Sequence, residues 1–292
     1  MRTALRRLPG PVAAAGDTEA VSLLVPERSA ARTRPPRAFL RRIAAAGLPG
    51  APPSAGPVTE TDLAGLQPAA ARYLRAMGVV GRPRTWSFRA HFVGRFRRRP
   101  DQPWMPMDAW QYNSAVEVAR LCRMRLTAAR VLPMWGWDTY RGGSGRMLGK
   151  ALGLVTVADG AGPEFDVGEL TTWLDDAVLL APGMLLDART TWSAVREDCF
   201  RVSITDAGRT VSGEIFLDDD GRPRDFRTED RWADLPGGPV RTPWNTPVEG
   251  WTVVDGRPRT TGGSAVWHLP DGEFTYGEMA LAALDLDVPA GR

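Results

Sequence analysis

The stretch Trp86-Ser87-Phe88-Arg89-Ala90-His91-Phe92 decides how this chain folds. Apolar and polar residues alternate along it, and the alternation continues through Arg95 and Phe96. A period of two is typical of a β-strand that buries one face and exposes the other. The sequence therefore predicts that a sheet begins near residue 86.

The same alternation returns along most of the remaining chain. Short turn signals separate the segments, among them Asp206-Ala207-Gly208, Asp220-Gly221, Asp255-Gly256 and Asp271-Gly272. Connections this short cannot hold a crossover helix, so neighbouring strands must be antiparallel. The pattern indicates a meander of roughly ten to twelve strands. The predicted strands lie at 104–113, 118–127, 131–140 and 146–157, and then from residue 200 onward.

Two helices interrupt the strand pattern. Apolar residues at helical spacing predict one near 62–77, with Gly78 as its C-terminal cap, and a second near 167–180, which ends before Pro182. A long meander with one apolar face must curl and be covered. The expected fold class is α+β: a single antiparallel domain over 59–292, curled into a half-barrel or open barrel with two main helices.

Residues 1–58 differ in composition from the rest. They hold nine Arg, three acidic residues, nine Pro and a single aromatic residue, Phe39. Such a segment buries too little apolar area to offset the entropy of ordering. We expect a disordered, basic Pro/Arg-rich tail. Within it, residues 37–46 place basic and apolar residues at helical spacing, which leaves peripheral contact with an anionic membrane as an alternative.

Export and membrane insertion are not indicated. Arg2, Arg6 and Arg7 are followed by Pro9 and by no apolar run, as a secretory signal would require. No stretch approaches the roughly 20 apolar residues that span a bilayer. The chain after residue 58 has 28 basic and 31 acidic residues, which argues against a nucleic-acid-binding body. The expected location is cytoplasmic, with membrane-peripheral contact as the alternative.

Catalytic signatures are sparse. The loop at 142–151 lacks the residues of a phosphate-binding loop, and the two histidines, His91 and His268, show no zinc-binding spacing, so no metal or cofactor is predicted. His268 lies close in sequence to Asp271 and Glu273 and is the candidate acid or base, with Lys150 or Asp138 as further partners. A position at a strand edge beside a turn is the favoured explanation for His268. Cys122 alternates with apolar neighbours, which indicates a buried, inert thiol.

Tryptophan is the compositional feature that suggests a function. All eleven Trp follow residue 58, and a concave sheet lined by them suits an acyl chain or another apolar molecule. Lys150 is the only lysine among 37 basic residues, which makes it a further candidate lining residue. The predicted ligand-binding residues are Trp86, Trp104, Trp110, Trp135, Trp137, Lys150 and Trp267.

Several motifs carry a resemblance to known proteins. They are Pro68-Ala69-Ala70-Ala71-Arg72-Tyr73-Leu74, Gly145-Arg146-Met147-Leu148-Gly149-Lys150, Thr242-Pro243-Trp244 and Ala265-Val266-Trp267-His268-Leu269-Pro270-Asp271-Gly272. Together they resemble an uncharacterised bacterial family known only as a domain of unknown function, over residues 60–285. That resemblance implies no activity and no catalytic residue. In outline the meander with helices is also similar to the half-barrel of lipoprotein carriers, although those proteins are exported.

Three functions remain open on these grounds. The first is binding of a lipid or other apolar small molecule without catalysis. The second is an enzyme of hydrolase or isomerase type that acts on an apolar substrate through His268 and the nearby carboxylates. The third is a structural domain that binds a protein partner. Fold alone does not choose among them.

Overall fold

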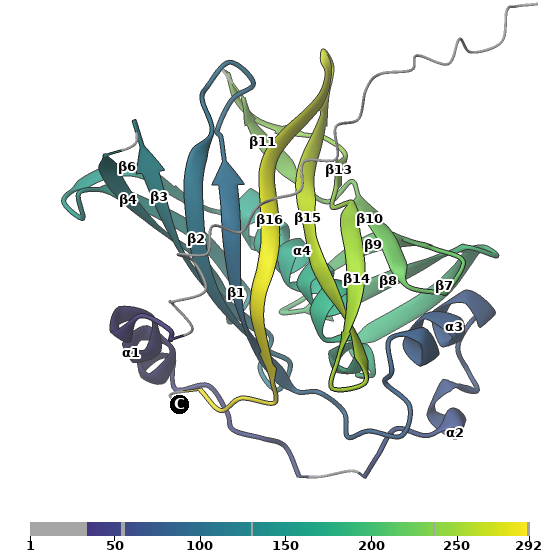
Figure 1. Cartoon of the computed structure of the whole chain (residues 1–292). Helices are drawn as coiled ribbons and strands as arrows, with labels where there is room; N and C mark the ends of the chain where they lie inside the picture. The colour runs from purple at the N-terminus through teal and green to yellow at the C-terminus, as the bar shows by residue number, and fades with distance from the viewer. Residues whose placement is uncertain (1–33, 54–55, 130, 236, 291–292) are drawn as a thin grey trace, which may run out of the picture.

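A computed structural model describes residues 34–53, 56–129, 131–235 and 237–290. One fourteen-stranded sheet dominates it and curls into an open half-barrel (Figure 1). All paired strands in the described residues are antiparallel, so the predicted α+β fold with a long curled meander is confirmed. Its first half contains β1 (Ser87–Phe96), β2 (Met105–Ser114), β3 (Ala119–Ala128), β4 (Leu132–Arg141), β5 (Ser144–Ala151) and β6 (Val155–Ala161).

The second half of the sheet follows the long helix α4 (Pro163–Leu180) and the 3₁₀ turn η1 (Pro182–Leu185). It contains β7 (Thr190–Arg196), β8 (Cys199–Asp206), β9 (Arg209–Leu217), β10 (Pro223–Thr228), β13 (Trp244–Asn245), β14 (Val248–Val254), β15 (Arg257–Leu269) and β16 (Gly272–Leu286). A separate hairpin is formed by β11 (Trp232–Leu235) and β12 (Gly238–Arg241). The two halves join where β16 pairs with β1, which leaves β6 and β7 at the two ends of the strand order.

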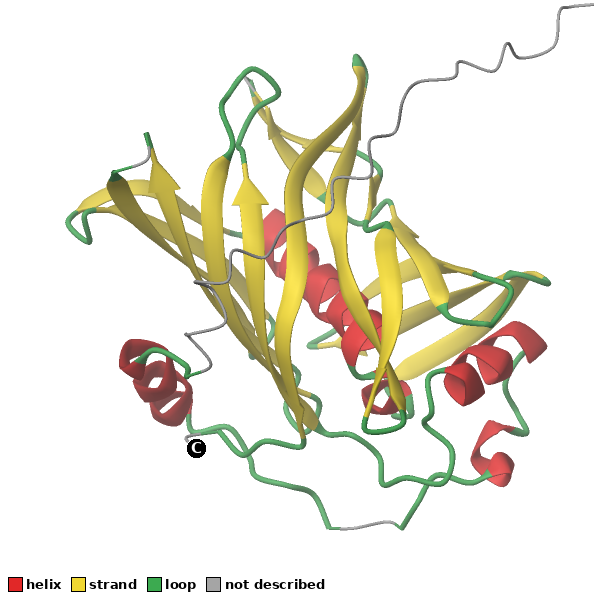
Figure 2. Ribbon diagram, viewed as in Figure 1, coloured by secondary structure: helices red, strands yellow, loops and turns green. Residues whose placement is uncertain are grey.

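Helix α4 lies across the concave face of the sheet (Figure 2). It begins at Pro163, four residues before its predicted start, because Pro suits the first turn of a helix. The Trp173 indole donates a 3.0 Å hydrogen bond to the Ser114 carbonyl of β2, and the Tyr73 hydroxyl donates one of 2.8 Å to the Val178 carbonyl. These buried bonds hold α4 against β2 and against the segment that carries Tyr73.

The helix predicted over 62–77 is divided into two. Helix α2 covers Glu60–Leu63, and α3 covers Pro68–Ala76. Gln67 is extended, with ψ of 147°, because the ring of the following proline disfavours the helical conformation of the residue before it. Pro68 therefore starts a new helix, and α3 packs its buried Tyr73 and Leu74 into the main core.

The expectation of a disordered tail over residues 1–58 is wrong for the part that the structure describes. Arg37–Ala46 forms α1, in which Phe39 and Ile43 are fully buried. The Phe39 ring stacks on Trp137 at 6.4 Å between centroids and tilts against Trp110 at 6.3 Å. The apolar side of this basic helix thus packs against the sheet. Residues 1–33 lie outside the described chain.

Candidate functional site

The strand register identifies which side chains face α4. Gln111 and Asn113 of β2 both donate to the Asp176 carboxylate of α4, at 2.7 and 3.2 Å. Alternate residues of a strand share a face, so Met107 and Ala109 point to the same side. Across the ladder these residues pair with Leu126 and Met124 of β3, which face the same way.

Beyond α4, this concave face is apolar and rich in methionine. We call the cluster the methionine surface, and all its members come from β1 to β4 and β16. Four of its ten residues are buried and six are half-buried. Methionine is unbranched and polarisable, and it adapts to ligands of varied shape. The members are Phe92, Phe96, Met105, Met107, Ala109, Cys122, Met124, Leu126, Met134 and Met279.

An aromatic group continues the methionine surface across β15 and β16. The Phe96 ring meets Tyr276 edge-on at 5.8 Å, and Tyr276 stacks on Trp267 at the same centroid distance. Trp267 in turn lies 6.4 Å from Trp244. The Arg231 guanidinium lies 4.3 Å from the centroid of the Trp244 ring. The concave face is therefore a continuous stretch of large apolar side chains.

A buried polar network borders the methionine surface beneath α4. The Arg120 guanidinium donates to Asp138 at 2.8 Å, to Glu169 at 3.0 Å and to Asp176 at 2.9 Å. Three carboxyl groups thus surround one cation, which cannot neutralise them all. Burial, reinforced by the charge of Asp138, raises the pKa of Glu169 well above its ordinary value. A hydrogen bond between Glu169 and Asp138 raises the pKa of Glu169 further.

Cys122 lies between the polar network and the methionine surface. Asp138 is its cross-strand partner on β4, and Gln111 is its partner on β2. Burial raises the pKa of its thiol to about 12. The predicted burial of this thiol is confirmed, and its raised pKa disfavours the reactive thiolate.

Most of the predicted ligand-binding residues lie elsewhere. Trp110 alternates with Ala109 and Gln111, so it points to the convex face, where it contacts Phe39 of α1. Trp135 and Trp137 pair with Lys150 and Leu148 of β5 on that face. The alternation grouped these residues correctly, but both faces of β2 to β4 carry large apolar residues. Only the position of α4 reveals which face is concave.

A cavity of about 370 Å³ opens on the convex face. The structure thus brings Trp135, Trp137 and Lys150 together, although not where the sequence analysis expected them. Ala38 of α1 contributes to the wall as well. The lining residues are Ala38, Arg123, Trp135, Trp137, Leu148, Lys150, Leu152 and Gly153.

The remaining predicted tryptophans are separated from one another. Trp267 belongs to the concave aromatic group described above. Trp104 lies just before β2 at one end of the sheet, with the guanidinium groups of Arg95 and Arg97 within 4.6 and 4.4 Å of its ring centroid. Trp86 precedes β1 at the opposite end, where its backbone N–H donates to Asp287 at 3.0 Å.

The predicted catalytic residues do not lie at the methionine surface. His268 follows the concave Trp267, so its ring points to the other face, where Nε2 lies 2.8 Å from the Asn245 amide oxygen. Its Nδ1 lies 3.5 Å from Glu273, whose side chain is 74% exposed. Asp271 is exposed in the turn that joins β15 to β16. His268 lines neither the convex cavity nor the cavity at the base of the half-barrel.

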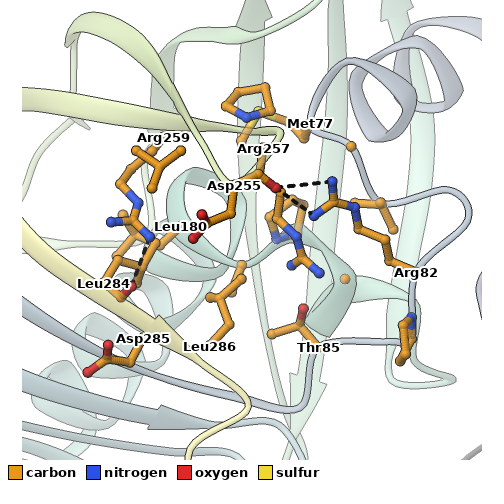
Figure 3. Close-up of a pocket in the computed structure, with 18 residues that line it drawn as sticks. Met77, Arg82, Thr85, Leu180, Asp255, Arg257, Arg259, Leu284, Asp285 and Leu286 are labelled. Atoms are coloured by element: carbon orange, nitrogen blue, oxygen red, sulfur yellow. Dashed lines mark hydrogen bonds between the residues drawn. The ribbon is translucent and has the colours of Figure 1, made fainter.

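A second cavity, of about 420 Å³, lies at the base of the half-barrel (Figure 3). The end of α3, η1, the β14–β15 turn and β16 all contribute to its wall. Arg82 donates to the Gly256 carbonyl at 3.1 Å, and Arg259 donates to the Leu284 carbonyl at 2.9 Å. These arginines therefore hold the wall together. Sequence reasoning missed this cavity because its residues come from four distant segments without a shared motif.

Two absences bear on the chemistry of these sites. Across the described residues, no three His, Cys, Asp or Glu side chains converge in a way that could hold a metal ion. Within the same residues, no helix combines the length and hydrophobicity that a bilayer crossing needs.

Residues 56–279 match a family of unknown function, DUF6544, and the chain belongs to this family. The family resemblance drawn from the sequence motifs is thus confirmed. No curated protein matches the chain.

Among solved structures, similar folds include three bacterial proteins, each with a TM-score of 0.40. One is a putative outer membrane lipoprotein-sorting protein domain from Vibrio parahaemolyticus, with 11% identity over 69% of this chain and 85% of the other. Another is a LolA superfamily protein from Nitrosomonas europaea, with 13% identity over 74% and 93%. The third is a DUF1329 family protein from Desulfovibrio piger, with 11% identity over 75% and 92%. These likenesses concern the fold alone.

Proposed function

We propose that the protein binds an apolar small molecule, such as a lipid acyl chain, on the methionine surface. The observation that carries this proposal is the set of six half-buried Met and Phe side chains on the concave face, all from strands and none from a covering helix. Covering apolar area of this kind contributes about 25 cal/mol per Å². A ligand that occupies the concave face would gain this contribution.

The surroundings of the methionine surface support a ligand with a long apolar body. The aromatic group of Trp244, Trp267 and Tyr276 extends the apolar area, and the Tyr276 hydroxyl is already occupied by the Trp244 indole at 3.0 Å. In the polar network beneath α4, Arg120 contacts all three carboxylates. Arg231, over the rings of Trp244 and Trp267, is the cation beside the aromatic group. Recognition of the apolar body would rest on shape and apolar contact.

Titration with cis-parinaric acid, a fluorescent fatty acid, tests the proposal. The double variant Met124→Gln with Met134→Gln keeps side-chain volume but adds two amides to the surface. We expect it to weaken binding about tenfold, because each amide must lose water without a partner. The matched control is Trp135→Ala, which alters the convex cavity and should bind the probe as the unmodified protein does.

Two outcomes would contradict the proposal. Equal affinity of the methionine double variant and the unmodified protein would exclude the methionine surface as the site. Loss of binding in Trp135→Ala alone would instead place the ligand in the convex cavity, with Lys150 and Arg123 as partners for its carboxylate.

The enzyme hypothesis keeps one specific observation in its favour. His268 lies within 3.5 Å of Glu273 and 2.8 Å of Asn245, which orients its ring. These residues are on the face opposite the methionine surface, so such an enzyme would act on a different molecule from the proposed ligand. His268→Gln should leave parinaric acid binding unchanged.

A further inference from the structure

Six exposed aliphatic side chains gather at one corner of the sheet. They are Val131, Leu132, Leu152, Leu154, Val155 and Val157, which we call the aliphatic corner. They make up two thirds of the nine exposed large hydrophobic residues in the described chain. Leu154 is 82% exposed and Val131 is 80% exposed. Contiguous exposed apolar groups mark interaction surfaces more often than scattered ones do.

The aliphatic corner is one connected feature. It comprises the β3–β4 turn, the β5–β6 turn and the outer strand β6. The Leu152 N–H donates a 3.0 Å hydrogen bond to the Pro133 carbonyl, which joins the two turns directly. Leu152 also lines the convex cavity together with Trp135. Both turns therefore project from the same end of the sheet, at the upper left in Figure 1.

The convex face beside this corner carries several basic side chains. Arg123 and Arg125 alternate with the concave Cys122 and Met124, so they point outward and are half-buried, and Lys150 does so opposite Trp135. None of these three cations forms a close ion pair with a described residue, although Asp108 lies opposite Arg125 on β2 and attracts the charge of Arg123. Helix α1 adds basic side chains, and its Arg42 lies 4.4 Å from the Trp137 ring centroid.

We propose that the aliphatic corner and the basic convex face dock on an anionic lipid bilayer. The two turns would insert into the boundary between headgroups and acyl chains, and the cations would meet anionic headgroups. Trp135 shares the convex cavity with Leu152 of the corner and with Lys150, and tryptophan favours that interface. Helix α1 contributes charge and not insertion, since Phe39 and Ile43 are buried against the sheet.

A second copy of the chain is the competing occupant, because β6 is an open strand edge. Pairing two β6 strands would bring two basic faces close together, and like charges would oppose it. Anionic lipid is complementary to the same charges. The charge pattern therefore favours the bilayer.

Vesicle co-sedimentation of the full chain tests this inference. We expect binding to vesicles of phosphatidylglycerol and phosphatidylcholine, weaker binding at high salt, and little binding to phosphatidylcholine alone. The double variant Val131→Asp with Leu154→Asp should lose about tenfold or more in affinity, and Lys150→Glu about tenfold. The matched control is Val253→Asp, at a valine that is 69% exposed on β14.

Each alternative gives a distinct result. Unchanged vesicle binding by the corner variants would overturn the inference and point to the six arginines that precede α1. Failure of the unmodified protein to bind anionic vesicles would also overturn it. A dimer that light scattering detects and Leu154→Asp disrupts, without vesicle binding, would identify the second copy as occupant. Vesicle lipids carry acyl chains, so the dependence on anionic headgroups and on the corner variants separates this inference from the proposed function.

Discussion

At the scale of single residues, the stability of the concave interior depends most on Arg120. It is 6% exposed and is the common partner of Asp138, Glu169 and Asp176. Arg120→Ala would leave those carboxyl groups buried without a cation. We expect the free energy of unfolding to fall by about 3 to 5 kcal/mol, measured by urea denaturation.

An exposed arginine provides the control for this loss. Arg201 contacts Glu214 at 2.6 Å, but its side chain is 51% exposed. Arg201→Ala should cost less than about 1 kcal/mol, since water screens the pair. Equal losses for the two variants would contradict the importance given to the buried network.

The same network predicts how stability depends on pH. The pKa of Glu169 is raised in the folded protein by burial, so the folded state keeps a proton that the unfolded chain releases above the ordinary pKa of 4.5. A raised carboxyl pKa stabilises the fold at low pH, and this contribution is lost as pH rises. Burial shifts the pKa of Asp175 and Asp176 upward as well.

We therefore expect the free energy of unfolding to decrease from pH 5 toward pH 8. Glu169→Gln should make that decrease smaller, because a neutral amide needs no proton. Glu60→Gln is the control. Hydrogen bonding from Arg75 lowers the pKa of Glu60, so the contribution of Glu60 to stability changes only at more acidic pH. Stability that rises between pH 5 and pH 8 would contradict the raised pKa of Glu169.

Sequence could group these residues but could not place them. Alternation correctly indicated that Cys122 lies among apolar neighbours. It could not tell which group faces α4, because both faces of β2 to β4 carry large apolar residues. That information lies in contacts between segments far apart in the chain, such as Gln111 with Asp176.

At the scale of elements, helix α1 shows how composition can mislead. Averaged over residues 1–58, the segment is basic, rich in proline and nearly without aromatic residues. Ten residues are enough to form a helix when two large side chains, Phe39 and Ile43, pack against the sheet. Average composition does not record such a local pattern, whereas helical spacing within 37–46 did.

Docking of α1 depends chiefly on Phe39. The ring is fully buried between Trp110 and Trp137. Phe39→Ala should cost about 3 kcal/mol or more of docking free energy. We expect faster amide hydrogen exchange within residues 37–46 and unchanged exchange in β2 and β3. The exposed Arg41→Ala is the control, and slow exchange in the Phe39 variant would show that other contacts hold the helix.

Local patterns predicted that the helices and most strands exist, but the predicted helices joined α2 to α3 and began α4 four residues late. The signals that set the true starts, Pro68 and Pro163, act within a few residues. Pairing of β1 with β16 could not be read locally, because it joins residues nearly 200 positions apart, such as Phe88 and Leu286. Nothing in a local pattern favours one distant partner strand over another.

At the scale of the whole molecule, the β1–β16 pairing makes one curved surface from two meanders. Helix α4 covers part of the concave face and leaves the methionine surface beside it (Figure 2). The aliphatic corner lies at the β6 end of the same sheet. A site for an apolar molecule and a surface suited to lipid thus belong to one continuous sheet.

Native mass spectrometry of the purified full chain, beside an organic extract of the same sample, tests the central claim most directly. The account predicts an apolar adduct of one ligand per chain, released by the solvent and absent from the Met124→Gln, Met134→Gln double variant. An unliganded mass that persists after incubation with excess fatty acid would contradict it, as would an adduct that the double variant retains in full.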